Sequence, residues 1–336
     1  MLPDVSVIVV TYNASDHVGP CLNAVLGSGG DGVKLELLVV DNASSDDTVA
    51  LVRRGWPAAR IIETGRNGGM AAGNNVGMLA AAGRSFLLLN SDAYLEPGAL
   101  RVMLDRLDAE PAGTVAAVAP RLINEDRSPQ RSVRGFPTIW RYATEFLYLR
   151  RIAPRTRMFN AFYGGGLDLS RAQRVEWATG ACMLVPRAAV DAVGLMDEAY
   201  FMYGEEVDWL QRMLGVGRSV AWEPAAVAVH LGGGSARSSW GTLYQRQLAN
   251  HVRYMARAHG VRAARRTRRL LLAALTVRAA GWRVAAAFPG DRAARRARAA
   301  AFAEGAATLR AIDPAQTTPP QLPSWDAVER AERPSR

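Results

Sequence analysis

The feature that most constrains the fold is a repeated pattern in the first half of the chain. Short apolar runs end in polar clusters and alternate with stretches that have helical spacing. In chain order, these segments cover residues 5–10, 18–26, 35–40, 46–53, 70–82 and 86–89. Runs 5–10 and 35–40 are rich in β-branched residues, which favour strands. Apolar strands separated by helices are typical of a mostly parallel sheet buried on both faces, so we predict an α/β protein.

Polar clusters follow all three predicted strands. They are Thr11-Tyr12-Asn13, Asp41-Asn42-Ala43-Ser44 and Asn90-Ser91-Asp92. Because ligands bind at the carboxyl ends of such strands, these clusters are candidate binding turns. A dinucleotide site is not indicated, since TYNASDH stands where a Gly-x-Gly-x-x-Gly turn would be needed. The glycine-rich run 68–73 comes too late for that role and is predicted to let Asn67, Asn74 and Asn75 reach a ligand.

Two residues are candidates for a metal site. Asp92, at a strand end, could hold a divalent cation that bridges two phosphates, although an Asx turn or a helix N-cap ahead of Pro97 fits the same residues. His230 closes a Val-Ala-Val-His strand and is either a metal ligand or a hydrogen-bonded surface residue. The Gly-Gly-Gly-Ser turn that ends at Ser235 could cradle phosphate.

Three carboxylates, Glu205, Glu206 and Asp208, lie within four residues and follow an aromatic segment. Mutual repulsion and a partly apolar surround both raise a carboxyl pKa, which suits a general base. The alternative is an exposed acidic first turn that complements a helix dipole.

The middle of the chain, residues 120–175, is predicted to be a long mobile excursion over the site. It is rich in arginine and contains Gly164-Gly165-Gly166. After it, residues 177–185 are predicted to form one strand with a close approach at Gly180. A further strand is expected over residues 225–229.

The net charge of +10 is unevenly distributed. Residues 239–336 carry 18 of the 41 basic and 6 of the 31 acidic groups, so residues 1–238 are close to neutral. Between Arg257 and Arg298, twelve arginines alternate with apolar residues, and a helical hairpin broken at residues 288–290 is expected. Arginines beside an apolar stripe indicate helices in an anionic membrane interface. Nucleic acid would satisfy the same charge but gives the apolar stripe no role, and a third reading is a solvated helical pair in a chain whose only lysine is Lys34.

These patterns divide the chain into a catalytic core over 1–238, a basic helical membrane-associating region over 239–312 and a disordered tail over 313–336. Cys21 and Cys182 are the only cysteines, so neither a disulfide framework nor a thiolate zinc site is supported. The first residues do not resemble a signal peptide, and no apolar run reaches about 18 residues. We therefore expect a cytoplasmic protein that is peripheral on a membrane surface.

Seven ordered motifs across residues 4–260 resemble the family 2 glycosyltransferases with a GT-A fold, and in particular their rhamnosyltransferase-like branch. The motifs are VSVIVVTYNAS, LLVVDNASSDDT, NGGMAAGNNVG, FLLLNSDAYLEPGAL, WATGACMLVPR, GLMDEAYFMYGEEVDWLQR and VAVHLGGGS. The resemblance implies a mixed, mostly parallel sheet flanked by helices that binds a nucleotide-sugar, with basic amphipathic helices at the C-terminus.

The resemblance also implies a role for each matching residue. The donor nucleotide would be bound by Thr11, Tyr12, Asn13, Asp41, Asn42, Ser44, Asn67, Gly73, Asn74, Asn90 and Ser91. Asp92 matches the last acid of the family's DXD element, and with His230 it would hold Mg²⁺ or Mn²⁺. Glu206 stands where the family usually has its catalytic Asp, with Asp208 and Glu205 as reserves. The acceptor would be contacted by Trp177, Thr179, Gly180 and Asp197.

The function that the resemblance implies is inverting transfer of a sugar from a nucleotide-sugar to a hydroxyl of a polyprenyl-diphosphate-linked saccharide in cell-envelope biosynthesis. L-rhamnose from dTDP-rhamnose is the expected donor sugar, and a UDP- or GDP-hexose is the alternative. A different class, a nucleotidyltransferase or nucleotide-binding regulator, would use a similar α/β core. It would be expected to show a glycine-rich first turn bearing Lys or Arg, and no such turn is present. The expected partners are the donor, the lipid-linked acceptor and an anionic membrane surface, not nucleic acid.

Overall fold

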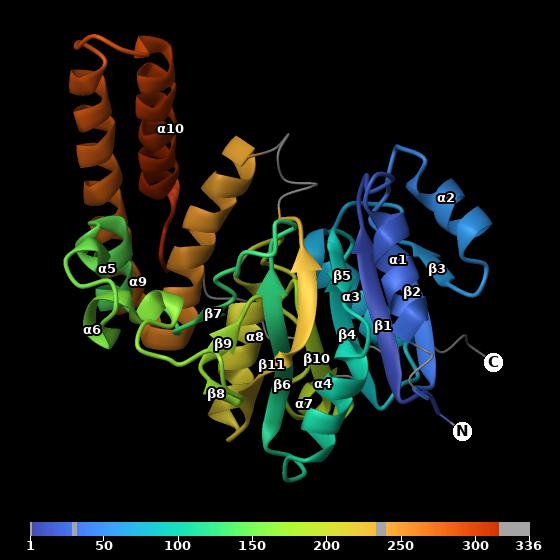
Figure 1. Cartoon of the computed structure of the whole chain (residues 1–336). Coiled ribbons are helices and arrows are strands. Elements are labelled where there is room, and N and C mark those ends of the chain that lie inside the picture. The colour runs from blue at the N-terminus through green and yellow to red at the C-terminus, as the bar shows by residue number, and fades with distance from the viewer. Residues whose placement is uncertain (1, 29–31, 233–239, 316–336) are drawn as a thin grey trace.

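A mixed sheet of nine strands forms the centre of the molecule (Figure 1). The computed structural model describes residues 2–28, 32–232 and 240–315, apart from the side chains of 240–242. The strand order is β3-β2-β1-β4-β10-β6-β11-β5, and β8 pairs with β11. Pairing is parallel from β3 through β4 and between β6 and β11, whereas β10 runs antiparallel to both β4 and β6. The nine strands are β1 (Val5–Thr11), β2 (Leu35–Asp41), β3 (Arg60–Glu63), β4 (Ser85–Asn90), β5 (Ala93–Leu95), β6 (Val115–Ile123), β8 (Gln173–Val175), β10 (Cys182–Pro186) and β11 (Ser219–His230).

Helices cover both faces of this sheet. Alternation along β1 sends Val7 and Val9 into one hydrophobic core, with α1 and α4, and Ile8 and Val10 into the other, with α3, α7 and α8. The helices of this part of the chain are α1 (Val18–Gly27), α2 (Thr48–Gly55), α3 (Gly69–Ala80), α4 (Ala99–Asp108), α7 (Arg187–Val193) and α8 (Glu205–Gly215). The predicted α/β class, with a mixed and mostly parallel sheet between helices, is confirmed.

The excursion over residues 120–175 is more regular than the sequence indicates. Its first residues extend β6 as far as Ile123, and the rest forms short elements beside the sheet. They are β7 (Val133–Arg134), α5 (Ile139–Phe146), η2 (Leu149–Arg151), α6 (Arg157–Asn160) and η3 (Ala161–Tyr163). The prediction of an irregular segment was therefore wrong in part, because α5 and β7 gain their stability from distant packing partners. Its mobility stays a prediction.

The single strand expected over residues 177–185 is divided in two. Residues of β9 (Trp177–Ala178) pair with β7 in a separate two-stranded sheet, and β10 begins only at Cys182. The turn between them is held at both ends, since the Thr179 amide donates to the Ser132 carbonyl and the Ala181 carbonyl accepts from the Asn90 amide, each at 2.9 Å. The strand expected over 225–229 is longer and starts at Ser219, with a register shift between Glu223 and Val227.

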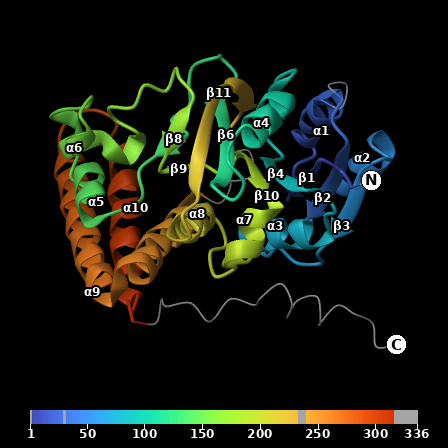
Figure 2. The same ribbon diagram turned by 90° about the horizontal axis from the view of Figure 1, so that it is seen from below.

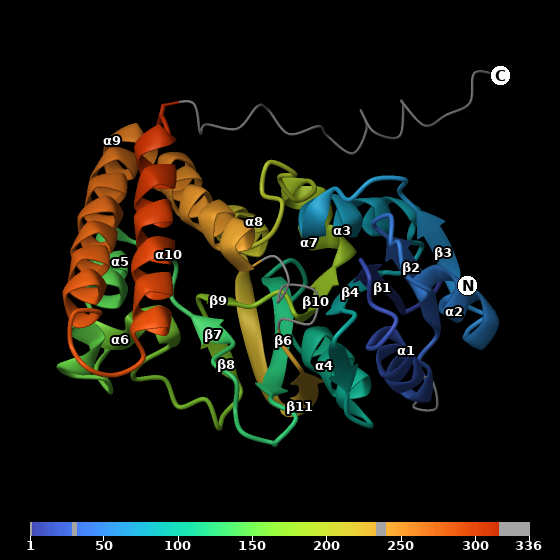
Figure 3. The ribbon, with the colours of Figure 1, turned by 90° about the horizontal axis from the view of Figure 1, so that it is seen from above.

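The C-terminal helices α9 (Trp240–Ala285) and α10 (Arg292–Ala311) stand at one end of the sheet, beside α5 and α6 (Figures 2 and 3). The helix α9 changes direction at Gly260, whose φ of 81° suits glycine. The predicted break at residues 288–290 lies between α9 and α10, so the helical hairpin is confirmed.

These helices share a core with the rest of the molecule. Leu248 and Val252 of α9 and Leu309 of α10 belong to the same buried cluster as Trp209 of α8 and Met78 of α3. The predicted boundary at residue 238 is therefore not a break in packing. Within the described part of the chain, no helix is long and apolar enough to cross a membrane. Ser235 and the tail from residue 316 onward lie outside the described residues.

Candidate active site

A cavity of about 890 Å³ opens at the carboxyl ends of β1 and β4. Most residues predicted for the site line it, although they come from distant parts of the chain. The predicted residues that line the cavity are Thr11, Tyr12, Asn42, Asn67, Asn74, Asn90, Ser91, Asp92, Trp177, Thr179, Gly180, Glu205, Glu206 and His230. Six residues that the resemblance assigns to the site are not among those that line it, namely Asn13, Asp41, Ser44, Gly73, Asp197 and Asp208. The prediction that Asn75 reaches a ligand is not borne out by the lining, because its side chain bonds the Met196 backbone and Glu198 instead.

Three of these six, namely Asn13, Asp41 and Ser44, hold the turns after β1 and β2 in place without lining the cavity. Asp41 is 2% exposed and accepts hydrogen bonds from the Thr11 hydroxyl at 3.0 Å and from the amide and hydroxyl of Ser44 at 2.9 and 2.5 Å. Asn13 has a left-handed φ of 48°, and its side-chain oxygen accepts from the Ser45 amide. Both turns are thereby held rigidly at the edge of the cavity.

The amino end of α3 forms the floor beside these turns. Asn42 donates to the Gly69 carbonyl at 3.0 Å, and the Met70 amide donates to the Phe201 carbonyl at 2.7 Å. Gly73 lies against β1, where an added Cβ would come within 2.6 Å of a Val10 methyl group. Gly73 therefore acts by close packing, which allows Asn74 to line the cavity.

Asp92 and His230 meet at one side of the cavity. The Oδ1 atom of Asp92 lies 3.4 Å from Nε2 of His230, a separation that lets one divalent cation contact both. The described residues contain no group of three or more His, Cys, Asp or Glu side chains suited to a metal.

Gln130, which the sequence did not single out, orients His230. Its Oε1 atom lies 3.0 Å from His230 Nδ1, while its Nε2 donates to the Asn124 side chain and the His230 carbonyl. Because the Gln130 amide nitrogen donates to those two oxygens, its Oε1 is left to accept a hydrogen bond from Nδ1 of His230, which fixes the orientation of the ring. No local sequence signal marks Gln130, because it meets His230 only through the pairing of β6 with β11.

Glu205 and Glu206 open α8 at the cavity wall. Glu206 accepts from the Gly204 amide at 3.2 Å, and Gly180 packs against its side chain. Burial raises the pKa of Glu206. Burial, and then the adjacent Glu206 charge, raise the pKa of Glu205 well above its usual value, and one oxygen of Glu205 is buried without a hydrogen-bond partner. Burial raises the pKa of the Tyr203 hydroxyl, and the nearby charges of Glu205, Asp92 and Glu206 raise it further.

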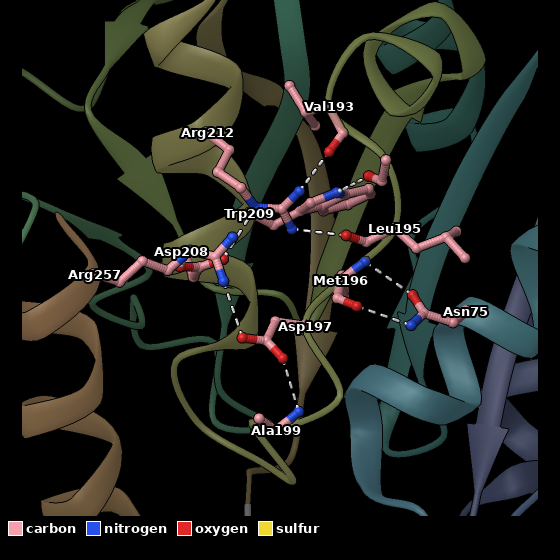
Figure 4. A network of polar contacts seen from close by, with 11 residues as sticks. Asn75, Val193, Leu195, Met196, Asp197, Ala199, Asp208, Trp209, Arg212 and Arg257 are labelled. Atoms are coloured by element: carbon pink, nitrogen blue, oxygen red, sulfur yellow. Dashed lines mark hydrogen bonds and ion pairs between the residues drawn. The ribbon is translucent and has the colours of Figure 1, made fainter. Parts of the chain in front are cut away.

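Asp208 and Asp197 lie behind this wall in an ion-pair network (Figure 4). Arg257 of α9 donates to Asp208 at 2.8 Å and to Asp197 at 3.0 Å, and Arg212 donates to Asp208 at 3.1 Å. Burial raises the pKa of Asp208 although both arginines oppose it. Both carboxylates therefore join α8 and the preceding loop to α9.

The remaining wall is aromatic and basic, and the sequence did not predict most of it. Its side chains come from the excursion and from α9, namely Arg131, Arg134, Tyr142, Phe146, Phe162, Tyr163, Tyr244, Asn250, His251, Tyr254 and Arg278. His251 is partly buried, its Nδ1 lies 3.0 Å from the Tyr142 hydroxyl, and burial lowers its pKa to about 4. Asn250 donates to the carbonyls of Met202 and Tyr203, so α9 also supports the loop that leads into Glu205.

Two solved structures with bound nucleotide have a similar fold. They are a mannosyltransferase from Pyrobaculum calidifontis in complex with GDP-Man and Mn²⁺ (TM-score 0.54, 19% identity, 93% of this chain and 88% of that one) and GalNAc-T7 with UDP, GalNAc and Mn²⁺ (TM-score 0.56, 16% identity, 76% and 48%). At these identities they show the fold alone, and that fold is the GT-A arrangement expected from the motifs.

Residues 6–175 match the model of glycosyl transferase family 2, and the chain belongs to that family. The predicted family is confirmed, and it favours glycosyl transfer over a nucleotidyltransferase or regulator. The chain is 29% identical over 235 residues to the N-acetylglucosaminyl-diphospho-decaprenol L-rhamnosyltransferase of Mycobacterium tuberculosis, covering 67% of this chain and 75% of that protein. It is 26% identical over 219 residues to a low-salt glycan biosynthesis hexosyltransferase of Haloferax volcanii, covering 63% and 62%.

Proposed function

We propose that this glycosyltransferase moves L-rhamnose from dTDP-rhamnose to a hydroxyl of a polyprenyl-diphosphate-linked saccharide, with inversion at the anomeric carbon. The observation that carries this proposal is that Glu206 lines the same cavity as Asp92 and His230. The similarity to a rhamnosyltransferase that acts on a diphospho-decaprenol acceptor supports the choice of both substrates.

Glu206 is the proposed general base. An inverting transfer needs one carboxylate that removes the proton from the acceptor hydroxyl as that oxygen attacks the anomeric carbon. Glu206 lines the cavity and its pKa is raised by burial, which makes it a better proton acceptor than an exposed carboxylate. Asp208 is less suited to act as the base, because it is held in ion pairs with Arg212 and Arg257. Glu205 lies next to Glu206, and the charge of Glu206 adds to the burial that raises the pKa of Glu205.

Asp92 and His230 are the proposed holders of Mg²⁺ or Mn²⁺, with Gln130 fixing the imidazole. Such a cation supplies charge neutralisation for the departing nucleoside diphosphate. The protein's own contribution is to keep Asp92 Oδ1 and His230 Nε2 on one side of the donor pocket and to exclude water with the aromatic wall.

A donor panel tests the reaction. Purified protein is incubated with dTDP-rhamnose, UDP-galactose and GDP-mannose, each with a lipid-diphosphate-linked N-acetylglucosamine, and nucleoside diphosphate release is measured. We expect release with dTDP-rhamnose that depends on the acceptor and is lost with EDTA. Faster release with a UDP- or GDP-hexose would overturn the choice of rhamnose, and an NMR spectrum with retained anomeric configuration would overturn the inverting mechanism.

We also propose peripheral attachment of the C-terminal helices to the inner membrane surface. Val277, Val284 and Phe288 are 71%, 62% and 60% exposed near the tip of the α9–α10 hairpin, where Arg283 and Arg292 are also exposed. Other apolar residues of the predicted stripe, such as Leu271 and Leu275, are buried and do not contribute. Co-sedimentation with anionic liposomes at moderate salt tests this proposal, and no binding would overturn it.

A further inference from the structure

Three guanidinium groups converge on one aromatic ring in the cavity wall. The ring centre of Tyr163 lies 5.2 Å from the guanidinium carbon of Arg134, 5.4 Å from that of Arg150 and 5.6 Å from that of Arg131. Arg134 also lies over Phe162 at 5.9 Å and over Trp177 at 5.6 Å. Rings occupy the faces of a guanidinium but not its N–H groups, which point outward in the plane.

The negative charge nearby does not balance this cluster. Arg150 pairs with Glu145 at 2.7 Å, but within the described part of the chain Arg131 and Arg134 have no carboxylate within ion-pair distance. The Nε atom of Arg134 is buried without a hydrogen-bond partner. Other arginines of the same excursion are paired, for example Arg141 with Glu176 at 2.6 Å. Because both unpaired arginines line the cavity, the cluster presents positive charge to whatever enters it.

The backbone around the cluster holds Arg134 in place before any ligand arrives. Arg134 is in β7 directly opposite Trp177 of β9. The next residue is Gly135, where an added Cβ would come within 2.6 Å of the Ala161 carbonyl oxygen, so β7 lies tightly against the segment that carries Phe162 and Tyr163. Because these groups are already ordered, less conformational entropy is lost when an anion binds.

We propose that Arg131 and Arg134 bind the diphosphate of the acceptor, and so select a lipid-diphosphate-linked saccharide over a neutral glycoside. This inference rests on the proposed function. Arg134 lies over Trp177, and Gly180 packs against Glu206 in the lining of the same cavity. Asp92 and His230 are the proposed holders of the cation that serves the donor diphosphate. Planar guanidinium groups with free N–H donors match phosphate oxygens, and a diphosphate offers enough charge to engage two of them.

The test measures binding of geranyl diphosphate by calorimetry in EDTA, which needs neither metal nor catalysis. We expect the wild-type protein to bind it, Arg131→Gln and Arg134→Gln each to weaken binding about tenfold, and the double variant to weaken it about a hundredfold. Arg171→Gln is the matched control, because Arg171 lies on the same excursion with its side chain 83% exposed and does not line the cavity. Thermal unfolding checks that each variant is folded. If Arg134→Gln does not fold, Arg131→Gln still tests the proposal, because Arg131 is exposed.

Two further measurements separate the sources of diphosphate. Binding of dTDP with Mg²⁺ should be unchanged in both variants, and transfer to a lipid-diphosphate-linked saccharide should fall more than transfer to the same sugar on an uncharged alkyl chain. Wild-type affinity for geranyl diphosphate in the double variant, or an equal loss of dTDP affinity, would overturn the acceptor assignment. Normal geranyl diphosphate binding by a wild-type protein that transfers no sugar would instead overturn the proposed function alone.

Discussion

The two sides of the cavity are built in opposite ways. The donor side and the acceptor side are the parts of the cavity wall that the proposed function assigns to each substrate. The donor side consists of turns that directly follow β1, β2 and β4, and its polar groups are tied to one another by hydrogen bonds such as those of Asp41. The acceptor side is assembled from the excursion, the turn at Gly180, the start of α8 and one face of α9, and its surface is aromatic and basic. The difference is one of origin, since the donor side follows the strands of the sheet whereas the acceptor side is gathered from distant segments, and the two meet at the Gln130–His230 and Asn90–Ala181 contacts.

The largest expected effect is on Glu206, the proposed general base in the lining of the cavity. Glu206→Gln should lower kcat by about a thousandfold, because an amide cannot take the proton of the acceptor hydroxyl. Nucleoside diphosphate release at saturating substrates measures it, with Asp191→Asn, an exposed change on α7, as the matched control. Near-normal turnover in Glu206→Gln would place the base elsewhere.

The next effect is on stability behind the acceptor side. Asp208→Asn removes the negative charge that pairs with both Arg212 and Arg257, so we expect the free energy of unfolding to fall by about 3 kcal/mol. Urea denaturation measures it. A variant of unchanged stability but abolished turnover would show that Asp208 acts in catalysis rather than in support of α9.

A pair of substitutions tests whether the two sides are independent. Asp41→Asn removes an acceptor for the Ser44 donors and should raise the Kd for dTDP about tenfold while leaving the acceptor KM unchanged. Trp177→Ala should raise the acceptor KM and leave the Kd for dTDP unchanged. Asp47→Asn, exposed in the turn before α2, is the control for the first. If either variant changed both constants equally, the two sides would have to be treated as one unit.

The smallest expected effect concerns Glu205. Because burial raises its pKa in the folded state, its ionisation above its unfolded pKa opposes folding, and this cost vanishes when both states are protonated. Glu205→Gln should therefore raise the melting temperature by about 2 °C at neutral or alkaline pH and leave it unchanged below about pH 4. Calorimetry across this range checks the sign, and a lower melting temperature at alkaline pH would contradict it.

The contrast between the two sides also explains what could be predicted from sequence. Thr11, Asn90 and Asp92 follow strands whose apolar runs are evident, so their convergence follows from the parallel sheet. Gln130, Arg134 and His251 reach the cavity through contacts with residues more than forty positions away. No local pattern marks such residues. The same reason accounts for the error at residues 177–185, where composition favours one strand and the Ser132 carbonyl imposes a turn.

The placement of α9 has a consequence for the modularity of the enzyme. The helix that was expected to serve only as an anchor supplies Tyr244 and His251 to the cavity and holds the loop before Glu205 through Asn250. Exchanging the C-terminal helices between relatives would therefore change the lining of the cavity and the support of Glu205, as well as the proposed contact with the membrane.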